Sequence, residues 1–260
     1  IILGDMDKWA AGLRFADKSY ILPAGKDERF LDVAQDIIKK EKVDIFIPLV
    51  DEEILKSYEI VKNMSKVELL LPEYNFAKIT LDKWILFKKL KKFKIPCPET
   101  YLGNFLLETP HIIKPRIGRG SRNVKEIKSK KQYEAYKVLT GLPESKILSQ
   151  NKIIGREFTI SVVVNKHGEV LAVVPKEVIY KRGITIVAIT RVNKEIESLC
   201  IEIQNRLKAN GPFNVQLILR EDGVPIVFEI NPRFSTTIAL TIKAGVNEID
   251  ILASDYRFSG

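Results

Sequence analysis

The chain has 260 residues, a formal net charge of +9 and 45% hydrophobic residues, which is typical of a globular protein with one large domain or two ordinary ones. No stretch approaches the roughly 18 to 20 uninterrupted apolar residues of a membrane span, and residues 1–5 are too short an apolar run for a signal peptide. Because the sequence starts without Met, we expect it to begin inside a longer protein.

The positions of the two cysteines and two histidines, and the net charge, limit the classes of function that are possible. Cys97 and Cys200 lie far apart without metal-type spacing, which predicts a reduced, cytoplasmic compartment. His111 and His167 are isolated, so neither a His-rich metal site nor a Ser-His-Asp triad can be assembled. The basic excess raises nucleic-acid binding as an alternative. Much of it lies on helical faces such as residues 88–92, so we favour solvated helix surfaces over a nucleic-acid partner.

The first part of the chain, residues 1–76, alternates short apolar runs with helical patterns. Strands are predicted at residues 1–4, 19–23, 43–50 and 67–71, and helices at residues 30–41 and after the acidic run at residues 51–53. Strands that alternate with helices predict a small parallel α/β domain. We expect it to lack its first strand, with residues 1–4 as the second.

A long amphipathic helix opens near residue 80, with Thr80 or Asp82 as its N-cap, and ends before the proline-rich residues 95–98. From Ile112 on the chain is richer in β-branched residues. Strands are predicted at residues 112–114, 146–148, 158–164, 170–174 and 184–189, before a helix at residues 194–209. This pattern predicts an α+β arrangement with a largely antiparallel sheet.

Polar side chains accompany a predicted hairpin near the C-terminus. Its parts are two buried strands at residues 216–219 and 226–230 and a turn at residues 221–223. Glu229 and Asn231 are two apart on a strand and point to one face, with Gln216 opposite. Since a buried carboxylate needs a cation, these oxygen donors suit Mg²⁺ held against phosphate. Arg233 falls on the same side, where it could meet an anion; the alternative is a hairpin whose polar residues only cap its end.

A second motif places Lys114 at the end of a strand, followed by a glycine-rich basic loop. Glycines such as Gly120 let backbone N–H groups approach an anion, and Ser121 adds a hydroxyl donor. Lys114 and Arg119 would neutralise phosphate charge. Because the lysine precedes the glycines, this differs from the G-x-x-x-x-G-K-[ST] loop, and a flexible surface turn is the alternative.

Glu157 begins a strand after the short connecting segment at residues 149–153. Its carboxylate could accept hydrogen bonds from ribose hydroxyls. The alternative is a strand glutamate that faces water.

In this order the segments resemble the ATP-grasp superfamily, and most closely its carbamoyl-phosphate-synthase large-chain-like branch. The resemblance covers nearly the whole chain and rests chiefly on Asn214-Val215-Gln216 and Glu229-Ile230-Asn231-Pro232-Arg233. The implied fold class is α/β plus α+β, with a truncated parallel α/β pre-ATP-grasp domain followed by a two-lobed ATP-grasp domain. The domains implied are residues 1–76, the linker helix and small lobe at residues 77–152, and the large lobe at residues 153–260.

The resemblance also implies the roles of individual residues around ATP. The nucleotide would be held by Lys83, Lys114, Arg119, Gly120, Ser121, Gln150, Asn151, Ile153 and Glu157, of which Glu157 would bind ribose. The metal ligands would be Gln216, Glu229 and Asn231, for Mg²⁺ with Mn²⁺ as an acceptable substitute. The catalytic residues would be Arg233 and Lys114, with Arg233 stabilising charge on the transferring phosphoryl group.

The implied reaction is that of an ATP-dependent carboxylate–amine ligase, in which a carboxylate becomes an acyl phosphate that an amine or ammonia attacks. Its partners would be small-molecule carboxylate and amine substrates, and a homodimer or larger assembly is compatible with it. Two alternatives stay open: an inactive nucleotide-binding regulatory or scaffold domain, and a carbamoyl-phosphate-synthase-like fragment of a larger assembly. Gln216 stands where many relatives carry glutamate, and the substrate-side segment at residues 181–185 is short. The substrates stay unnamed.

Overall fold

The computed structural model describes residues 1–103 and 110–257. The chain forms two compact units, residues 1–70 and residues 71–260. Within the described residues, no helix is both long enough and apolar enough to cross a membrane.

The first unit is a small α/β domain with two parallel strand pairs, β1 with β2 and β3 with β4. Its elements are β1 (Ile2–Asp5), the 3-10 helix η1 (Ala11–Arg14), β2 (Lys18–Ile21), α1 (Phe30–Glu41), β3 (Ile45–Phe46), α2 (Asp51–Val61) and β4 (Glu68–Leu69). Helix α1 has the predicted bounds, because Phe30, Ala34 and Ile38 repeat every four residues and are all buried in the core.

The strand predicted at residues 43–50 is wrong in length, since only Ile45–Phe46 pairs with a neighbour. Pro48 has no N–H to donate to a sheet. The N–H groups of Leu49 and Val50 donate instead to Oε1 of Glu53, at 2.8 and 3.0 Å. The end of the predicted strand therefore serves as the N-terminal cap of helix α2.

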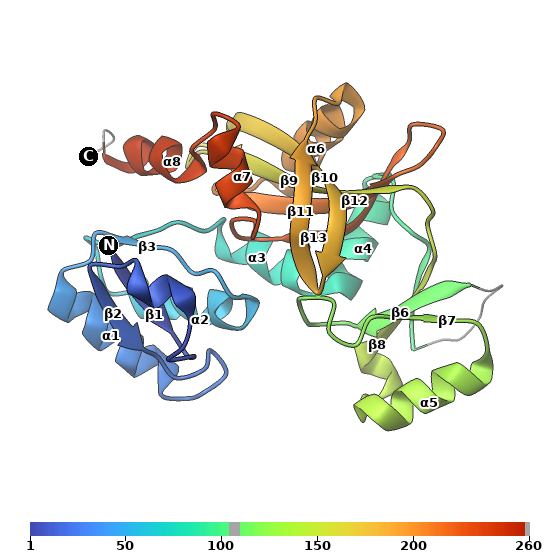
Figure 1. Ribbon diagram of the computed structural model, residues 1–260, viewed down its shortest axis with the longest axis horizontal. Coiled ribbons are helices and arrows are strands. Elements are labelled where there is room, and N and C mark those ends of the chain that lie inside the picture. Colours follow the sequence, from blue (N-terminus) through green and yellow to red (C-terminus); the bar gives the residue numbers. More distant parts are fainter. Residues whose placement is uncertain (104–109, 258–260) are drawn as a thin grey trace. The chain divides into compact units, whose positions relative to one another are not determined.

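The second unit contains two antiparallel sheets (Figure 1). The smaller sheet has the order β5-β8-β6-β7. Its elements are β5 (Thr100–Leu102), β6 (His111–Pro115), β7 (Lys125–Ile127), α5 (Lys130–Thr140), the 3-10 helix η2 (Glu144–Lys146) and β8 (Ile147–Asn151). Helix α5 packs on this sheet through Tyr133 and Tyr136, which join Ile113, Ile127 and Ile147 in one apolar cluster.

The larger sheet has the order β11-β10-β9-β12-β13. Its strands are β9 (Arg156–Val164), β10 (Val170–Arg182), β11 (Ile184–Thr190), β12 (Phe213–Leu219) and β13 (Pro225–Asn231). The helices of the unit besides α5 are α3 (Tyr74–Leu81), α4 (Lys83–Lys92), α6 (Lys194–Leu207), α7 (Ile238–Lys243) and α8 (Glu248–Arg257). Buried side chains of α4 and α6, among them Leu86, Leu90, Ile196 and Ile203, share one large core with β9, β12 and β13.

The fold class is confirmed: a small parallel α/β domain precedes a domain with antiparallel sheets. Asp82 rather than Thr80 is the cap of the long helix, because its carboxylate accepts from the N–H groups of Trp84 and Ile85. Thr80 lies inside α3 and donates to the carbonyl of Phe76. The predicted strand at residues 170–174 continues to Arg182, so the short segment at residues 181–185 is the tip of a hairpin.

Candidate functional site

A cavity of about 260 Å³ lies between the two sheets of the second unit. Its floor is the β12–β13 hairpin, where the register pairs Ile218 with Ile226 and Gln216 with Glu229. Apolar side chains therefore give way to polar ones along the hairpin. On the facing sheet, Ile112 lies two residues before Lys114 on the same face, so the cavity has an apolar end and a charged end.

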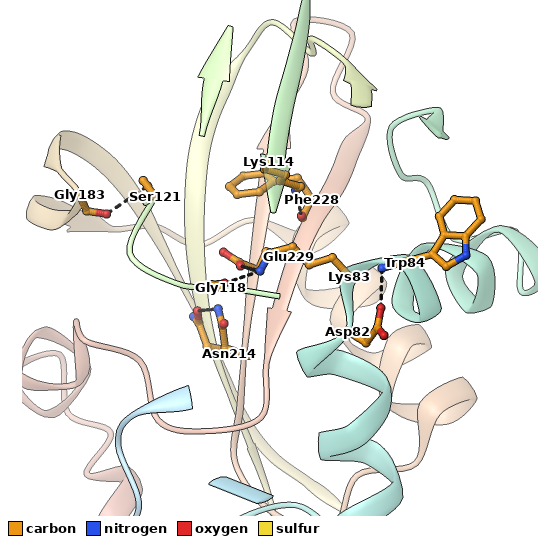
Figure 2. A network of polar contacts seen from close by, with 11 residues as sticks. Asp82, Lys83, Trp84, Lys114, Gly118, Ser121, Gly183, Asn214, Phe228 and Glu229 are labelled. Atoms are coloured by element: carbon orange, nitrogen blue, oxygen red, sulfur yellow. Dashed lines mark hydrogen bonds and ion pairs between the residues drawn. The ribbon is translucent and has the colours of Figure 1, made fainter. Parts of the chain in front are cut away.

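Two buried lysines lie near one carboxylate, that of Glu229, at the charged end, and Lys83 is in direct contact with it (Figure 2). The Nζ of Lys83, the first residue of α4, lies 3.0 Å from Oε1 of Glu229 and donates to the carbonyl of Gly118. The Nζ of Lys114 donates to the carbonyl of Phe228 at 3.0 Å. Two cations against a single anion leave this end of the cavity positive, which suits an anionic ligand.

The surroundings lower the pKa values of both Glu229 and Lys114. Burial alone would raise the pKa of Glu229, but the charges of Lys83 and Lys114 hold it below its usual value. Burial lowers the pKa of Lys114 from 10.5 to about 7, against the opposing attraction of Glu229. The carboxylate is thus ionised near neutral pH, while Lys114 is poised to gain or lose a proton.

The amide of Asn231 is oriented by its neighbour Asn214, which the sequence prediction gave no role. The Nδ2 of Asn214 donates to Oγ1 of Thr159 and to the carbonyl of Ile160, at 2.9 and 2.8 Å. A carbonyl only accepts, so Oδ1 of Asn214 must face Nδ2 of Asn231, at 3.5 Å. Asn231 therefore uses its Nδ2 for the contact with Asn214, and its Oδ1 can accept a hydrogen bond or bind a metal ion.

Gln216, Glu229 and Asn231 also line a second, smaller cavity next to the first, together with Arg233. Their oxygen atoms are the kind of ligand that Mg²⁺ takes up when phosphate supplies further oxygens. Within residues 1–103 and 110–257, no group of three or more His, Cys, Asp or Glu side chains could hold a metal alone. The residues therefore fit a cation that arrives with a phosphorylated ligand.

The glycine-rich loop is fixed at both ends. At its start, Arg116 forms a two-pronged ion pair with Asp82, with the shortest contact at 2.6 Å. At its end, the hydroxyl of Ser121 donates to the carbonyl of Gly183 at the tip of the β10–β11 hairpin, at 3.2 Å (Figure 2). Gly183 has φ +76°, which favours glycine at this turn. The loop is held beside the cavity rather than left as a surface turn.

The end of β8 and the segment that follows it form the remaining wall. Gln150, Asn151 and Ile153 line the larger cavity, as does Glu157 at the start of β9. The carboxylate of Glu157 does not face water alone, because the Nζ of Lys181 lies 2.6 Å from its Oε1.

Every residue predicted for the site lines one of these two adjoining cavities. The larger one has Lys83, Lys114, Arg119, Ser121, Gln150, Asn151, Ile153, Glu157, Gln216 and Glu229, and the smaller one adds Gly120, Asn231 and Arg233. Sequence reasoning placed Lys181 only in a substrate-side segment and gave it no role, although it lines both cavities. The signal available was the strand pattern, which continues past residue 174 and carries Lys181 to the hairpin tip.

An amphipathic cavity between two antiparallel sheets, cationic at one end and flanked by a glycine-rich loop, has the features of a nucleotide-binding site. The family model of the ATP-grasp domain matches residues 80–237, and the chain belongs to this family. A model described as the PylC-like N-terminal domain matches residues 1–69. The ATP-grasp fold implies ATP binding.

Curated relatives are similar to the chain in sequence, and solved structures are similar to it in fold. The chain is 30% identical over 172 residues to a D-alanine–D-alanine ligase of Petrotoga mobilis, which covers 58% of this chain and 57% of that protein. An L-amino acid ligase of Bacillus licheniformis has a TM-score of 0.71 at 19% identity, over 91% of this chain and 62% of that one. A biotin carboxylase of Campylobacter jejuni has a TM-score of 0.78 at 13% identity, over 96% and 63%. The matched region thus spans a little over half the length of the Petrotoga mobilis ligase.

Proposed function

We propose that this protein is an ATP- and Mg²⁺-dependent ligase that activates a carboxylate as an acyl phosphate for attack by an amine or ammonia. The observation that carries the proposal is the placement of Lys83 and Lys114 around Glu229, directly opposite Gln216. A positive cavity end with oxygen donors at its floor suits a polyphosphate and the cation that accompanies it. Membership of the carbamoyl-phosphate-synthase-like branch stays a prediction.

The nucleotide would lie along the cavity from its apolar to its charged end. Ile112 and the segment containing Gln150, Asn151 and Ile153 would contact the base, and Glu157 would accept from the ribose hydroxyls. The phosphates would then reach the positive end. The groups that would hold them are Lys83, Lys114, Arg119, Gly120 and Ser121.

Gln216, Glu229 and Asn231 would hold Mg²⁺, or Mn²⁺ in its place. When bound, such a cation neutralises phosphate charge and polarises the bond to the transferred phosphoryl group. Glu229 would exchange its contact with Lys83 for this role, which frees the lysine for a phosphate oxygen. With one carboxylate among three ligands, the protein contributes little charge, so the affinity for free cation should be low.

The chemistry that follows has two steps. A carboxylate oxygen of the substrate attacks the γ-phosphorus, the bond to the β-phosphate oxygen breaks, and ADP leaves. The amine nitrogen then attacks the acyl carbon, the carbon–oxygen bond to phosphate breaks, and the nitrogen gives up a proton. Arg233 is buried at the wall of the smaller cavity, where its guanidinium would stabilise charge on the phosphoryl oxygens and on the acyl phosphate. In this scheme residues 77–152 supply the small lobe and residues 153–260 the large lobe.

The names of similar proteins guide the choice of substrates to test. Two of the similar proteins are named as ligases of amino acids, one for D-alanine and one for L-amino acids. Amino acids are therefore the first carboxylates and amines to test, with bicarbonate and small acids next.

The test is a screen for Mg²⁺-dependent ADP release by the wild-type chain with these compounds singly and in pairs. Mg·ATP binding is measured alongside by calorimetry, and Arg233→Lys and Glu229→Gln serve as variants. We expect Arg233→Lys to bind ATP within about threefold of wild type and to lose about 100-fold in stimulated turnover. A folded protein that binds no Mg·ATP would refute the ligase.

The two alternatives give different outcomes in the same screen. ATP binding without stimulated turnover by any substrate would indicate a regulatory or scaffold domain. Turnover that appears only after a further protein is added would indicate a fragment of a larger assembly.

A further inference from the structure

One amide at the apolar end of the cavity has its orientation fixed by the fold. Gln150 lies on β8, and the sheet register places Thr100 of β5 on one side of it and Ile112 of β6 on the other. Gln150 is only 3% exposed and lines the cavity beside Ile112. It is therefore a buried polar group that a flat apolar ring at this end of the cavity would meet.

The hydrogen bonds around Gln150 leave one arrangement of its amide. The hydroxyl of Thr100 donates its single hydrogen to the carbonyl of Pro98, at 2.8 Å. Oγ1 of Thr100 can then only accept, so the atom of Gln150 that faces it must be the donor Nε2, at 2.8 Å. A turned amide would set Oε1 against Oγ1 with no hydrogen between them, or, if the hydroxyl turned to donate to Oε1, it would take the donor away from the buried carbonyl of Pro98; in either case a buried group loses its hydrogen bond. Gln150 is thereby made to offer its carbonyl oxygen, on the side away from Thr100.

We infer that Thr100 is a positioning residue for base selection: by holding Gln150 as an acceptor, it favours a purine with an exocyclic amino group over one with an oxo group. Adenine carries an amino donor where guanine carries a carbonyl. An amino group can donate to Oε1 of Gln150, whereas a carbonyl in its place would meet a second acceptor. This inference rests on the proposed nucleotide site and adds the device by which the site distinguishes bases.

The experiment measures dissociation constants of the full chain for ATP, GTP and ITP with Mg²⁺, by competition against a fluorescent ATP analogue. We expect the wild type to bind ATP at least about tenfold more tightly than GTP and ITP. An acceptor oxygen that pairs with an amino group has no hydrogen bond to make with a carbonyl group in the same place. The triphosphate of 2,6-diaminopurine, which keeps the 6-amino group, should bind within about threefold of ATP. These comparisons need no variant and test the base atom directly.

Variants then test Thr100 itself. Thr100→Val lets the amide turn, so the ATP/GTP ratio should fall about tenfold, mainly because GTP binds better. Thr100→Ser keeps the hydroxyl and should keep the ratio. The double change Thr100→Val with Gln150→Glu should restore the preference, because a carboxylate accepts in either orientation. Thr140→Val is the matched control: Thr140 also donates to a carbonyl, that of Tyr136, but it lies on α5 and lines neither cavity.

The outcomes separate this inference from the proposed function. No binding of any nucleotide by folded protein would overturn both. Tight binding of ATP, GTP and ITP alike by the wild type would leave the nucleotide site standing and overturn the role of Thr100. An unchanged ATP/GTP ratio in Thr100→Val would do the same.

Discussion

The Nζ of Lys83 and Oε1 of Glu229 lie 3.0 Å apart, with side chains 9% and 19% exposed. The ionised carboxylate is therefore balanced by the protein's own cations before any ligand arrives. In the proposed site, a metal ion at Glu229 would replace this contact, and a phosphate would take over the lysine. Such an exchange would make stability and ligand binding depend on the same pair of residues.

Glu229→Gln should lower the free energy of unfolding by about 3 kcal/mol, since it leaves two buried lysines without their anion. Tripolyphosphate without metal should restore part of this loss, because it supplies negative charge at the same place. Urea denaturation with and without tripolyphosphate measures both effects. Glu144→Gln is the control, because Glu144 pairs with Lys137 at an exposed site and should cost less than about 1 kcal/mol. Equal losses in the two variants would contradict the prediction.

The lowered pKa of Lys114 should make the free energy of unfolding depend on pH. Its pKa falls from 10.5 to about 7 on folding because the ammonium is buried. Between these values the unfolded chain binds a proton that the folded chain does not, so the free energy of unfolding should rise with pH across this window. Below about pH 7 both states are protonated and the full penalty of the buried charge applies. Denaturation of wild type and Lys114→Met from pH 6.5 to 9.5 tests this, and the same slope in both would refute it.

The same lysine predicts a pH-dependent affinity for nucleotide. A bound polyphosphate favours the charged ammonium and raises its pKa, so binding above pH 7 should take up a proton. The dissociation constant for ATP should therefore rise by up to about tenfold per pH unit above 7. Calorimetry in buffers of different ionisation enthalpy measures the uptake directly. Lys114→Arg, which stays charged, should show neither the uptake nor the slope.

The ion pair between Lys181 and Glu157 is expected to couple the binding of the ribose to the binding of the phosphates. Their ion pair is about one-quarter exposed on each side and measures 2.6 Å, so it adds at most about 1 kcal/mol to stability and Lys181→Met should fold. Ribose hydroxyls that bind Glu157 would release Lys181 toward the phosphates. We expect Lys181→Met to weaken ATP binding about tenfold and to weaken 2′-deoxy-ATP binding less. Equal losses for the two nucleotides would show that the groups act independently.

The sequence allowed much of the fold, and the approach of the hairpin's polar residues to one another, to be predicted where these depend on local pattern. Glu229 and Asn231 share a face through the period of two of a strand, and the hairpin register then sets Gln216 of the neighbouring strand opposite Glu229. Helix α1 followed from its apolar spacing. The strand at residues 43–50 failed because the cap of α2 competes for its N–H groups.

Contacts between distant segments could not be predicted in this way. Lys181 reaches Glu157 from another strand, and Thr100 reaches Gln150 across 50 positions in the sequence. The role of Asn214 depends on which atoms its amide meets, which no spacing reveals. Local pattern and the family resemblance together predicted residues that line the two cavities, while the orientation of their side chains is a property of the folded chain.

We expect the carboxylate of Asp82 to stabilise both the N-terminus of α4 and the glycine-rich loop. It accepts from the N–H groups of Trp84 and Ile85 and pairs with Arg116 at the start of the loop. Asp82→Ala should lose the cap and the ion pair, whereas Asp82→Asn keeps a good cap and should be about 1 kcal/mol more stable than Asp82→Ala. Both should weaken ATP binding, because Arg116 no longer anchors the loop.

Ser129→Ala provides the control, since Ser129 caps α5 by accepting from the N–H of Gln132 and lines neither cavity. It should also cost about 1 kcal/mol of stability and leave the ATP dissociation constant unchanged. Thermal denaturation and ATP titration of the three variants separate the two roles. If Asp82→Asn binds ATP as wild type does, the anchor at Arg116 has no part in holding the loop for the nucleotide, and only the helix cap remains as the function of Asp82.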